Sequence, residues 1–185
     1  MPYDIPVCGY QNNYCNTLRI WSAHSPEIID MRSFSEGDYV KASAERELAE
    51  TISRILYPND SHNAGKSLRL RQQYFFTSAT LQYLLKRHKA QGLPLSVLPD
   101  YVAIQINDTH PSIAIAELMR LLVDQERLSW EEADRICRAV FSYTNHTIMS
   151  EALETWPCYL MQNLLPRIYM ILCEIDRRAR LDTEA

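Results

Sequence analysis

The stretch that decides the fold is residues 101–111, which read YVAIQINDTHP. Its first half is apolar and rich in β-branched side chains, and it ends abruptly in the polar residues Asn107, Asp108 and His110. A proline and a helix-like pattern follow at once. This pattern predicts a buried strand over residues 101–106, whose carboxyl end carries polar side chains to the sheet edge where open α/β proteins bind ligands.

A second stretch repeats this design: residues 139–147 read AVFSYTNHT and end in a second Asn-His pair. Two such strand ends predict a site shared between neighbouring βα loops. Each of the two strand ends also has a purely structural interpretation. Asp108 or Thr109 could cap the helix that follows, and His146 could be a hydrogen-bonded structural histidine. The spacing alone leaves both interpretations open.

The rest of the chain is mostly helical in pattern. Ser129 and Glu132 form a capping box that opens one helix. The residue patterns predict helices over residues 38–56, 67–91, 111–126, 129–140 and 157–180, and short strands over 3–7 and 17–22. Strands that alternate with helices predict an α/β fold with parallel strands and flanking helices. Two parallel strands are too few for a doubly wound domain, so residues 101–185 are expected to supply βα units to an incomplete, Rossmann-like domain.

Charge and composition exclude several classes of partner. The chain has 185 residues and a formal net charge of −4, so no basic field is available for nucleic acid or an anionic membrane surface. No apolar run reaches the ~20 residues of a membrane span, and the N-terminus lacks the pattern of a secretion signal. The five cysteines form no CxxC pair. They predict free, buried thiols in a cytoplasmic protein.

Residues 59–66, which read NDSHNAGK, predict an exposed polar loop. Asp60, Ser61 and His62 are neighbours in this loop, and adjacent residues cannot form the geometry of a catalytic triad. The histidines show no metal-ligand spacing, so no metal site is expected. Glycine-rich phosphate-binding motifs are also absent from the sequence. The helix over residues 38–56 is polar on most sides, which predicts that it projects into solvent or lies at an interface.

Several segments together resemble glycogen (α-glucan) phosphorylase of the bacterial type. They include PYDIPVCGYQNN, LYPNDS, GKSLRLRQQYFF, VAIQINDTHPSIAIAELMRLLVD and SYTNHTIMSEALETWP. The resemblance covers essentially the whole chain, and the INDTHP and YTNHT segments are highly specific to that family. Three positions depart from the usual pattern. Ser61 stands where many members have Asn, and Ala116 and Ser150 stand where Pro is common.

The resemblance implies a specific reaction and fold. Members of the family cleave α-1,4-glucan ends with inorganic phosphate and release α-glucose 1-phosphate. They use pyridoxal phosphate, whose phosphate group performs the acid–base work. Their fold is of the glycosyltransferase B type, with two Rossmann-like domains around a cleft. By this resemblance residues 1–185 are expected to be a partial N-terminal domain.

The resemblance also implies residue roles. His146 matches the catalytic-site histidine that contacts the glucose unit being cleaved, and Asp108 and His110 match residues that line the neighbouring sugar position. The loop over residues 59–66 matches the loop that gates the cleft. Its substrate-binding positions would be Asn59, Asp60 and Ser61. The helix over 38–56 matches a projecting helix through which two subunits form a homodimer.

No segment resembles the family's cofactor lysine or its phosphate-binding basic residues. We therefore expect this chain to bind no pyridoxal phosphate and to be inactive alone. One alternative is a stand-alone, non-catalytic module that binds glucan or dimerises. Another is a retaining glycosyltransferase such as glycogen synthase, although the INDTHP and YTNHT segments argue against it. Flanking genomic sequence that continues in frame into a cofactor-lysine domain would favour the phosphorylase.

Overall fold

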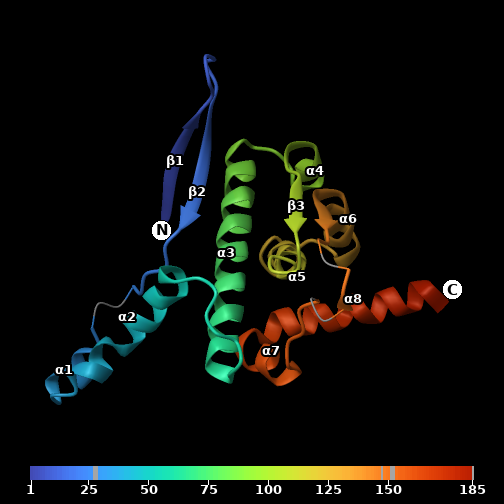
Figure 1. Cartoon of the computed structure of the whole chain (residues 1–185). Helices are drawn as coiled ribbons and strands as arrows, with labels where there is room; N and C mark the ends of the chain where they lie inside the picture. Colours follow the sequence, from blue (N-terminus) through green and yellow to red (C-terminus); the bar gives the residue numbers. More distant parts are fainter. Residues whose placement is uncertain (27–28, 147, 151–152, 185) are drawn as a thin grey trace. The chain divides into compact units, whose positions relative to one another are not determined.

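The computed structural model describes residues 1–26, 29–146, 148–150 and 153–184. Thr147, the last residue of the predicted second strand end, lies outside these residues. The chain divides into two compact units, Met1–Gln72 and Gln73–Ala185, and the boundary falls within helix α3 (Figure 1). No helix among the described residues is long and apolar enough to cross a lipid bilayer.

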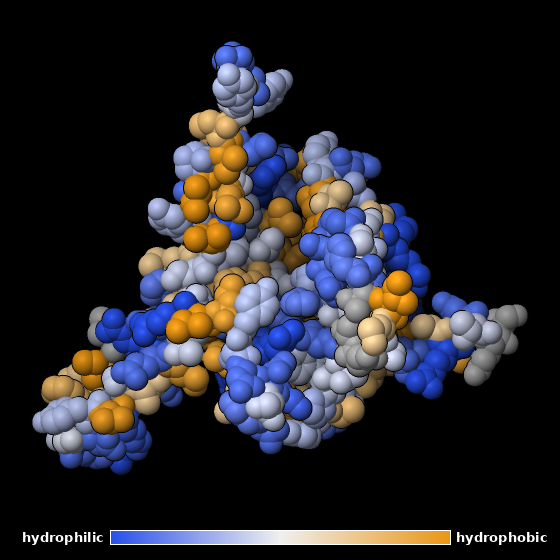
Figure 2. Space-filling view, in the orientation of Figure 1, coloured by the Kyte–Doolittle hydropathy of each residue, from blue (hydrophilic) through white to orange (hydrophobic). Residues whose placement is uncertain are grey.

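The first unit opens with an antiparallel hairpin. It consists of β1 (Pro2–Cys8) and β2 (Cys15–Trp21), which confirms the two short strands predicted there. Alternate side chains point to opposite faces of the hairpin. One face carries the Asp4–Arg19 ion pair at 2.6 Å. The other is apolar yet exposed, and Figure 2 shows apolar surface along the hairpin. The exposed side chains of this apolar face are Tyr3, Ile5, Val7, Leu18 and Ile20.

Two helices follow the hairpin. α1 (Met31–Ser35) forms because the Asp30 side chain accepts from the Arg32 backbone amide at 3.0 Å and starts a helical turn. α2 (Tyr39–Arg54) confirms the helix predicted over residues 38–56. The Asp38 side chain caps it by accepting from the Lys41 amide at 3.0 Å. Only Ala42 is buried in α2, as its polar sequence predicts.

α3 (Asn63–Ala90) begins four residues before the predicted start at residue 67. His62 explains the difference, because its Nδ1 atom accepts from the Gly65 amide at 3.0 Å and caps the first turn. The predicted loop over residues 59–66 is therefore too long, and only residues 59–62 lie outside the helix. Gly65 is required here, since a Cβ atom at this position would lie 1.7 Å from the Asn59 carbonyl oxygen.

The second unit contains the predicted pair of parallel strands. β3 (Ile104–Asn107) pairs with β4 (Phe141–Thr144), and Ile104 lies opposite Phe141 in the register. The predicted strand over residues 101–106 began too early. The short helices η1 (Leu95–Val97) and α4 (Leu98–Tyr101) precede β3. A proline in the first turn of α4 favours helix at this point.

The connection between the strands is helical, as parallel pairing requires. α5 (Ile113–Arg120) runs into a π-helical turn, η2 (Leu121–Gln125), and α6 (Trp130–Val140) leads into β4. The predicted helix over 111–126 thus has the right extent but changes type after Arg120. The capping box at the start of α6 is confirmed. Helices α5 and α6 contact each other, and α5 also contacts α8.

The predicted helix over residues 157–180 is wrong in one respect, because the structure breaks it in two. α7 (Cys158–Leu164) and α8 (Pro166–Glu184) are separated by Leu165, which has φ −137° and ψ 58°. Pro166 causes the break, since proline disfavours helical geometry at the preceding residue and donates no backbone hydrogen bond.

The cysteine prediction is right about the free thiols and wrong about their burial. All five cysteines are free, but Cys137 alone is buried. The others lie on the hairpin, at the start of α7 and on α8, where apolar sequence neighbours do not ensure burial of the thiol.

Much of the parallel sheet is also exposed: in β4 only Phe141 is partly covered. The mixed α/β class with parallel strands and flanking helices is confirmed.

Candidate functional site

The carboxyl ends of β3 and β4 lie side by side. The Asp108 backbone amide donates to the Thr144 carbonyl oxygen at 2.8 Å, which extends the ladder by one step beyond Asn107. The Gln105 side-chain amide also donates to the Thr144 hydroxyl, again at 2.8 Å. The two predicted strand ends therefore meet at one edge of the sheet, as parallel pairing with this register dictates.

Asp108 occupies an unusual backbone conformation, with φ +69°. A non-glycine residue in the left-handed region is uncommon, and asparagine and aspartate tolerate it best. Its Oδ1 atom accepts from the Thr109 amide at 2.6 Å. The interpretation in which Asp108 or Thr109 caps the following helix is wrong, because α5 has Ser112 at its N-cap and no side-chain cap at all. Asp108 is held at the edge by the turn and is free of a capping role.

His110 is half-buried in the turn between β3 and α5. Its Nδ1 atom is buried and has no hydrogen-bond partner among the described residues. Buried polar atoms are nearly always paired, so an unpaired one marks a position where a ligand or an ordered water supplies the partner. This nitrogen is therefore a candidate contact for a ligand hydroxyl.

His146 lies just beyond the end of β4 and its side chain is exposed. Its Nε2 atom donates to the Oδ1 atom of Asn107, the last residue of β3. Because an amide oxygen can only accept a hydrogen bond, the imidazole is the donor in this contact. Asn107 was predicted to lie at the strand end, but its role as the partner of His146 was not. The parallel register, which sets Asn107 opposite Thr144, is what brings the two together.

The loop residues Asn59, Asp60 and Ser61 belong to the first unit, whereas the strand ends belong to the second. All three are exposed. The Asn59 Oδ1 atom accepts from the Ser61 amide at 2.9 Å, and Asp60 lies 3.6 Å from Arg69 in α3. The loop is thus shaped by its own side chains and held against the first turns of α3.

The strand-end site can hydrogen-bond several hydroxyl groups at once. It presents a carboxylate, an amide and two imidazoles on adjacent turns, which is the donor and acceptor set that polyhydroxylated ligands require. No lysine or arginine occurs in residues 104–112 or 141–146, so the strand ends bring no cation for a phosphate group. Among the described residues, no group of three or more His, Cys, Asp or Glu side chains could hold a metal ion.

The lysines do not fit a pyridoxal phosphate site within this chain. Lys41, Lys86 and Lys89 are exposed, and Lys66 is half-buried in the first turn of α3. The Lys89 ammonium is paired with Glu126 at 2.7 Å. A Schiff-base lysine needs an enclosed site with cationic partners for the phosphate. None of these lysines has such surroundings among the described residues.

Comparison with known proteins identifies the family. The sequence model of the family described as carbohydrate phosphorylase matches residues 1–185. The muscle form of glycogen phosphorylase from Ovis aries is 51% identical over 186 residues, which cover 96% of this chain and 22% of that protein. The liver form from Homo sapiens is 50% identical with the same coverage of each chain, 96% and 22%. The chain thus spans 22% of the length of these relatives and belongs to the carbohydrate phosphorylase family.

Proposed function

We propose that this chain is a segment of an α-glucan phosphorylase and forms part of the wall that contacts the sugar. The meeting of the Asp108–His110 turn with His146 at one sheet edge carries the proposal. Family membership supports the reaction, which is cleavage of α-1,4-glucan by inorganic phosphate to give α-glucose 1-phosphate. The similarity to glycogen phosphorylases supports the substrate class.

The exposure of the parallel sheet supports a role within a larger domain. Parallel strands are normally covered on both faces, and a two-stranded sheet is marginal by itself. In β4, Ser142, Tyr143 and Thr144 are all exposed. Further strands and helices of a glycosyltransferase B-type fold would cover them. Pyridoxal phosphate and the cations for inorganic phosphate would come from other parts of that protein. The exposed free thiols fit a reducing, cytoplasmic setting.

In the proposed reaction, His146 contacts the glucose unit at the cleavage point, and Asn107 positions its imidazole. Asp108 and His110 bind hydroxyls of the neighbouring sugar. Asn59, Asp60 and Ser61 form the gating loop. The cofactor supplies the acid–base chemistry at its phosphate when it is bound. The residues of this chain bind and orient the sugar, so their removal should weaken transition-state stabilisation more than folding.

Kinetics of the longer protein test this proposal. His146→Ala should lower kcat/KM for glucan by ~10²-fold, because a sugar contact that strengthens in the transition state is worth about 2–4 kcal/mol. His24→Ala is the matched control, since His24 is also exposed and hydrogen-bonded, to Ser22 at 2.8 Å. Activity of His146→Ala within threefold of the parent would contradict the catalytic role.

Homodimerisation through residues 38–56 is the second part of the proposal. Exposed apolar side chains on α1 and α2 support it: Phe34, Tyr39, Val40 and Leu48. The Phe34 and Tyr39 rings pack edge-to-face with centroids 5.1 Å apart. An isologous contact would bury this patch against its own copy. A dimer through this patch is equally compatible with a stand-alone dimerisation module. Flanking genomic sequence that continues in frame into a cofactor-lysine domain would favour the phosphorylase over that module.

Sedimentation equilibrium tests the dimer. Ala44→Arg combined with Leu48→Asp should convert a weak dimer into a monomer. Leu181→Asp on α8 is the control, because Leu181 and Leu48 have nearly equal exposure, 52% and 53%. Monomeric parent protein at high concentration, with circular dichroism showing folded helices, would refute dimerisation through α2.

A further inference from the structure

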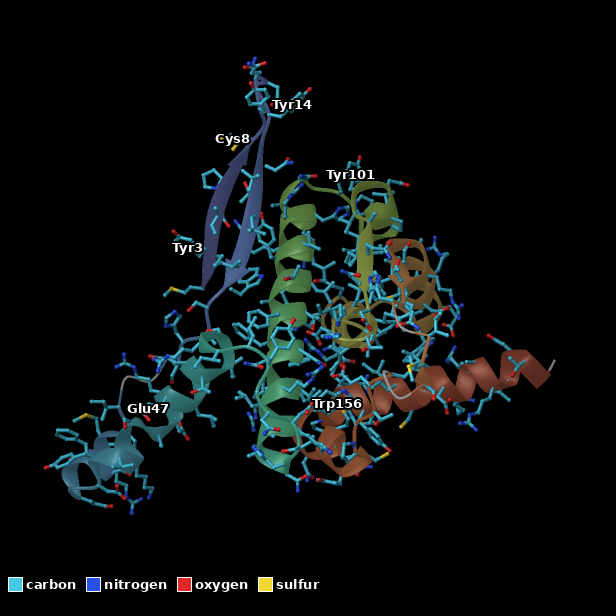
Figure 3. The ribbon with its side chains drawn as sticks, viewed as in Figure 1. Tyr3, Cys8, Tyr14, Glu47, Tyr101 and Trp156 are labelled. Atoms are coloured by element: carbon cyan, nitrogen blue, oxygen red, sulfur yellow. The ribbon has the colours of Figure 1, made fainter. Side chains whose placement is uncertain are left out.

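Two thiols face each other at the loop end of the hairpin. Cys8 ends β1, Cys15 begins β2, and the two residues are partners in the strand register. Their Sγ atoms lie 3.3 Å apart and both residues are exposed. Figure 3 shows Cys8 near the loop end of the hairpin, with Tyr14 farther toward the tip.

The hairpin ladder shows which kind of pair the cysteines form. The Gly9 amide donates to the Tyr14 carbonyl oxygen at 2.9 Å, so these neighbours form a hydrogen-bonded pair. Hydrogen-bonded and non-hydrogen-bonded pairs alternate along antiparallel strands, which makes Cys8 and Cys15 a non-hydrogen-bonded pair. Pro6, two residues earlier, fits the same alternation because it has no amide proton to donate.

Non-hydrogen-bonded pairs have the geometry that a cross-strand disulfide needs. Their Cα atoms are about 4.5 Å apart, within the roughly 4.4–6.8 Å range of disulfides. The bond therefore needs only a closer approach of the two Sγ atoms, from 3.3 Å to ~2.05 Å. The strands can keep their register. The short loop between the residues also keeps one thiol at high effective concentration near the other.

We propose that Cys8 and Cys15 are a modification site that closes into a reversible disulfide when a low-molecular-weight disulfide acts as oxidant. The thiolate of one cysteine attacks the small disulfide, forms a mixed disulfide and releases one small thiol. The thiolate of the other cysteine then attacks the protein sulfur of that mixed disulfide and releases the second small thiol. Two electrons pass from the cysteine pair to the oxidant, and the two cysteine protons end on the released thiols.

The hydrogen bond between the thiols affects the rate of this reaction. The pKa of Cys15 lies above its ordinary value because the Cys8 thiol hydrogen-bonds to it, with a smaller contribution from burial. A raised pKa lowers the thiolate fraction at neutral pH. The first attack on the small disulfide is therefore expected to be slow near neutral pH, so closure requires the small disulfide to be abundant.

Closure would stabilise a marginal element. An isolated two-stranded hairpin is barely stable in water, and a disulfide reduces the freedom of the unfolded loop. The Gly9 amide, which closes the loop by donating to Tyr14, should exchange its hydrogen more slowly after oxidation. Oxidation would thus order residues 9–14 without moving the apolar face of the hairpin.

Oxidised glutathione applied to the full 185-residue chain tests the proposal. After remaining thiols are blocked, chymotrypsin can cut at Tyr10 and Tyr14, between the cysteines. We expect one product in which the Cys8 and Cys15 peptides are joined, at least ~10-fold more abundant than glutathione adducts of either cysteine, because the second thiol attacks the mixed disulfide intramolecularly. A reducing agent should separate the joined peptides.

Single variants provide the matched controls. Cys8→Ser and Cys15→Ser each remove the second thiol, so the remaining cysteine should retain glutathione as a stable mixed disulfide. The proposal is overturned if parent protein accumulates separate glutathione adducts at Cys8 and Cys15 instead of the joined peptides. Unchanged exchange of the Gly9 amide after oxidation would refute the ordering of the loop.

Discussion

The sharpest stability prediction concerns the buried carboxylate of Glu117 in α5, which is 0% exposed. Its two oxygens accept two hydrogen bonds from Arg120, at 2.7 and 2.9 Å. Ser78 donates to it at 2.7 Å and Tyr74 at 3.1 Å. The carboxylate therefore links Tyr74 and Ser78 of α3 to Arg120 of α5 within the second unit.

Arg120→Met is the informative perturbation, because it removes the cation while keeping an apolar stem of similar length. It leaves the buried Glu117 carboxylate uncompensated, which costs about 3–5 kcal/mol. Domains of this size have a free energy of unfolding of only ~5–15 kcal/mol. For a chain of this length the expected loss corresponds to a fall in Tm of roughly 6–20 °C.

Urea unfolding followed by circular dichroism measures this loss. Arg138→Met is the control, since Arg138 makes an equally short 2.7 Å ion pair with Asp134 but its side chain is 71% exposed. Exposed pairs contribute ~0–1 kcal/mol, so the control should change little. Adding Glu117→Met to Arg120→Met should recover part of the loss, because the unpaired charge is gone. Equal effects of Arg120→Met and Arg138→Met would refute the reasoning.

Three further outcomes are expected. Ser129→Ala should lower the free energy of unfolding by ~1 kcal/mol in urea titrations, because it deletes the capping-box acceptor of α6, and an unchanged midpoint would contradict this. Burial raises the pKa of the Cys137 thiol to about 12, so an alkylating reagent near neutral pH should modify Cys158 and leave Cys137 intact. Because that pKa is higher in the folded state, Cys137 favours folding below its unfolded value near 9, and this contribution is lost as pH rises toward about 12. Cys137→Ala should flatten the alkaline loss of stability, and identical pH profiles for the two proteins would oppose this assignment.

Local sequence signals predicted the elements that carry the site. The apolar stretches followed by polar residues placed the ends of β3 and β4, and Ser129 and Glu132 placed the start of α6. These signals work because they depend on side chains within a few residues of one another. The break at Pro166 was equally local and could have been predicted from the proline alone.

Other features depend on residues distant in sequence. Asn107 and His146 meet because two strands pair in a particular register, and Glu117 meets Tyr74 and Ser78 because α3 packs near α5. The thiols of Cys8 and Cys15 face each other only in the observed hairpin register. If either strand pair shifted its register by one residue, side chains that now face each other would point to opposite faces of the sheet.

By itself, the sequence determined the α/β class, the helices with strong caps and the polar residues at two strand ends. Those features follow from hydrophobic period, capping chemistry and proline geometry, which act over a few residues. Only the tertiary structure decided that Asp108 adopts a left-handed conformation, that Asn107 orients His146, and which cysteines are buried. These outcomes depend on strand register and on which surfaces the packed helices cover, because burial and hydrogen-bond partners are set by elements far apart along the chain.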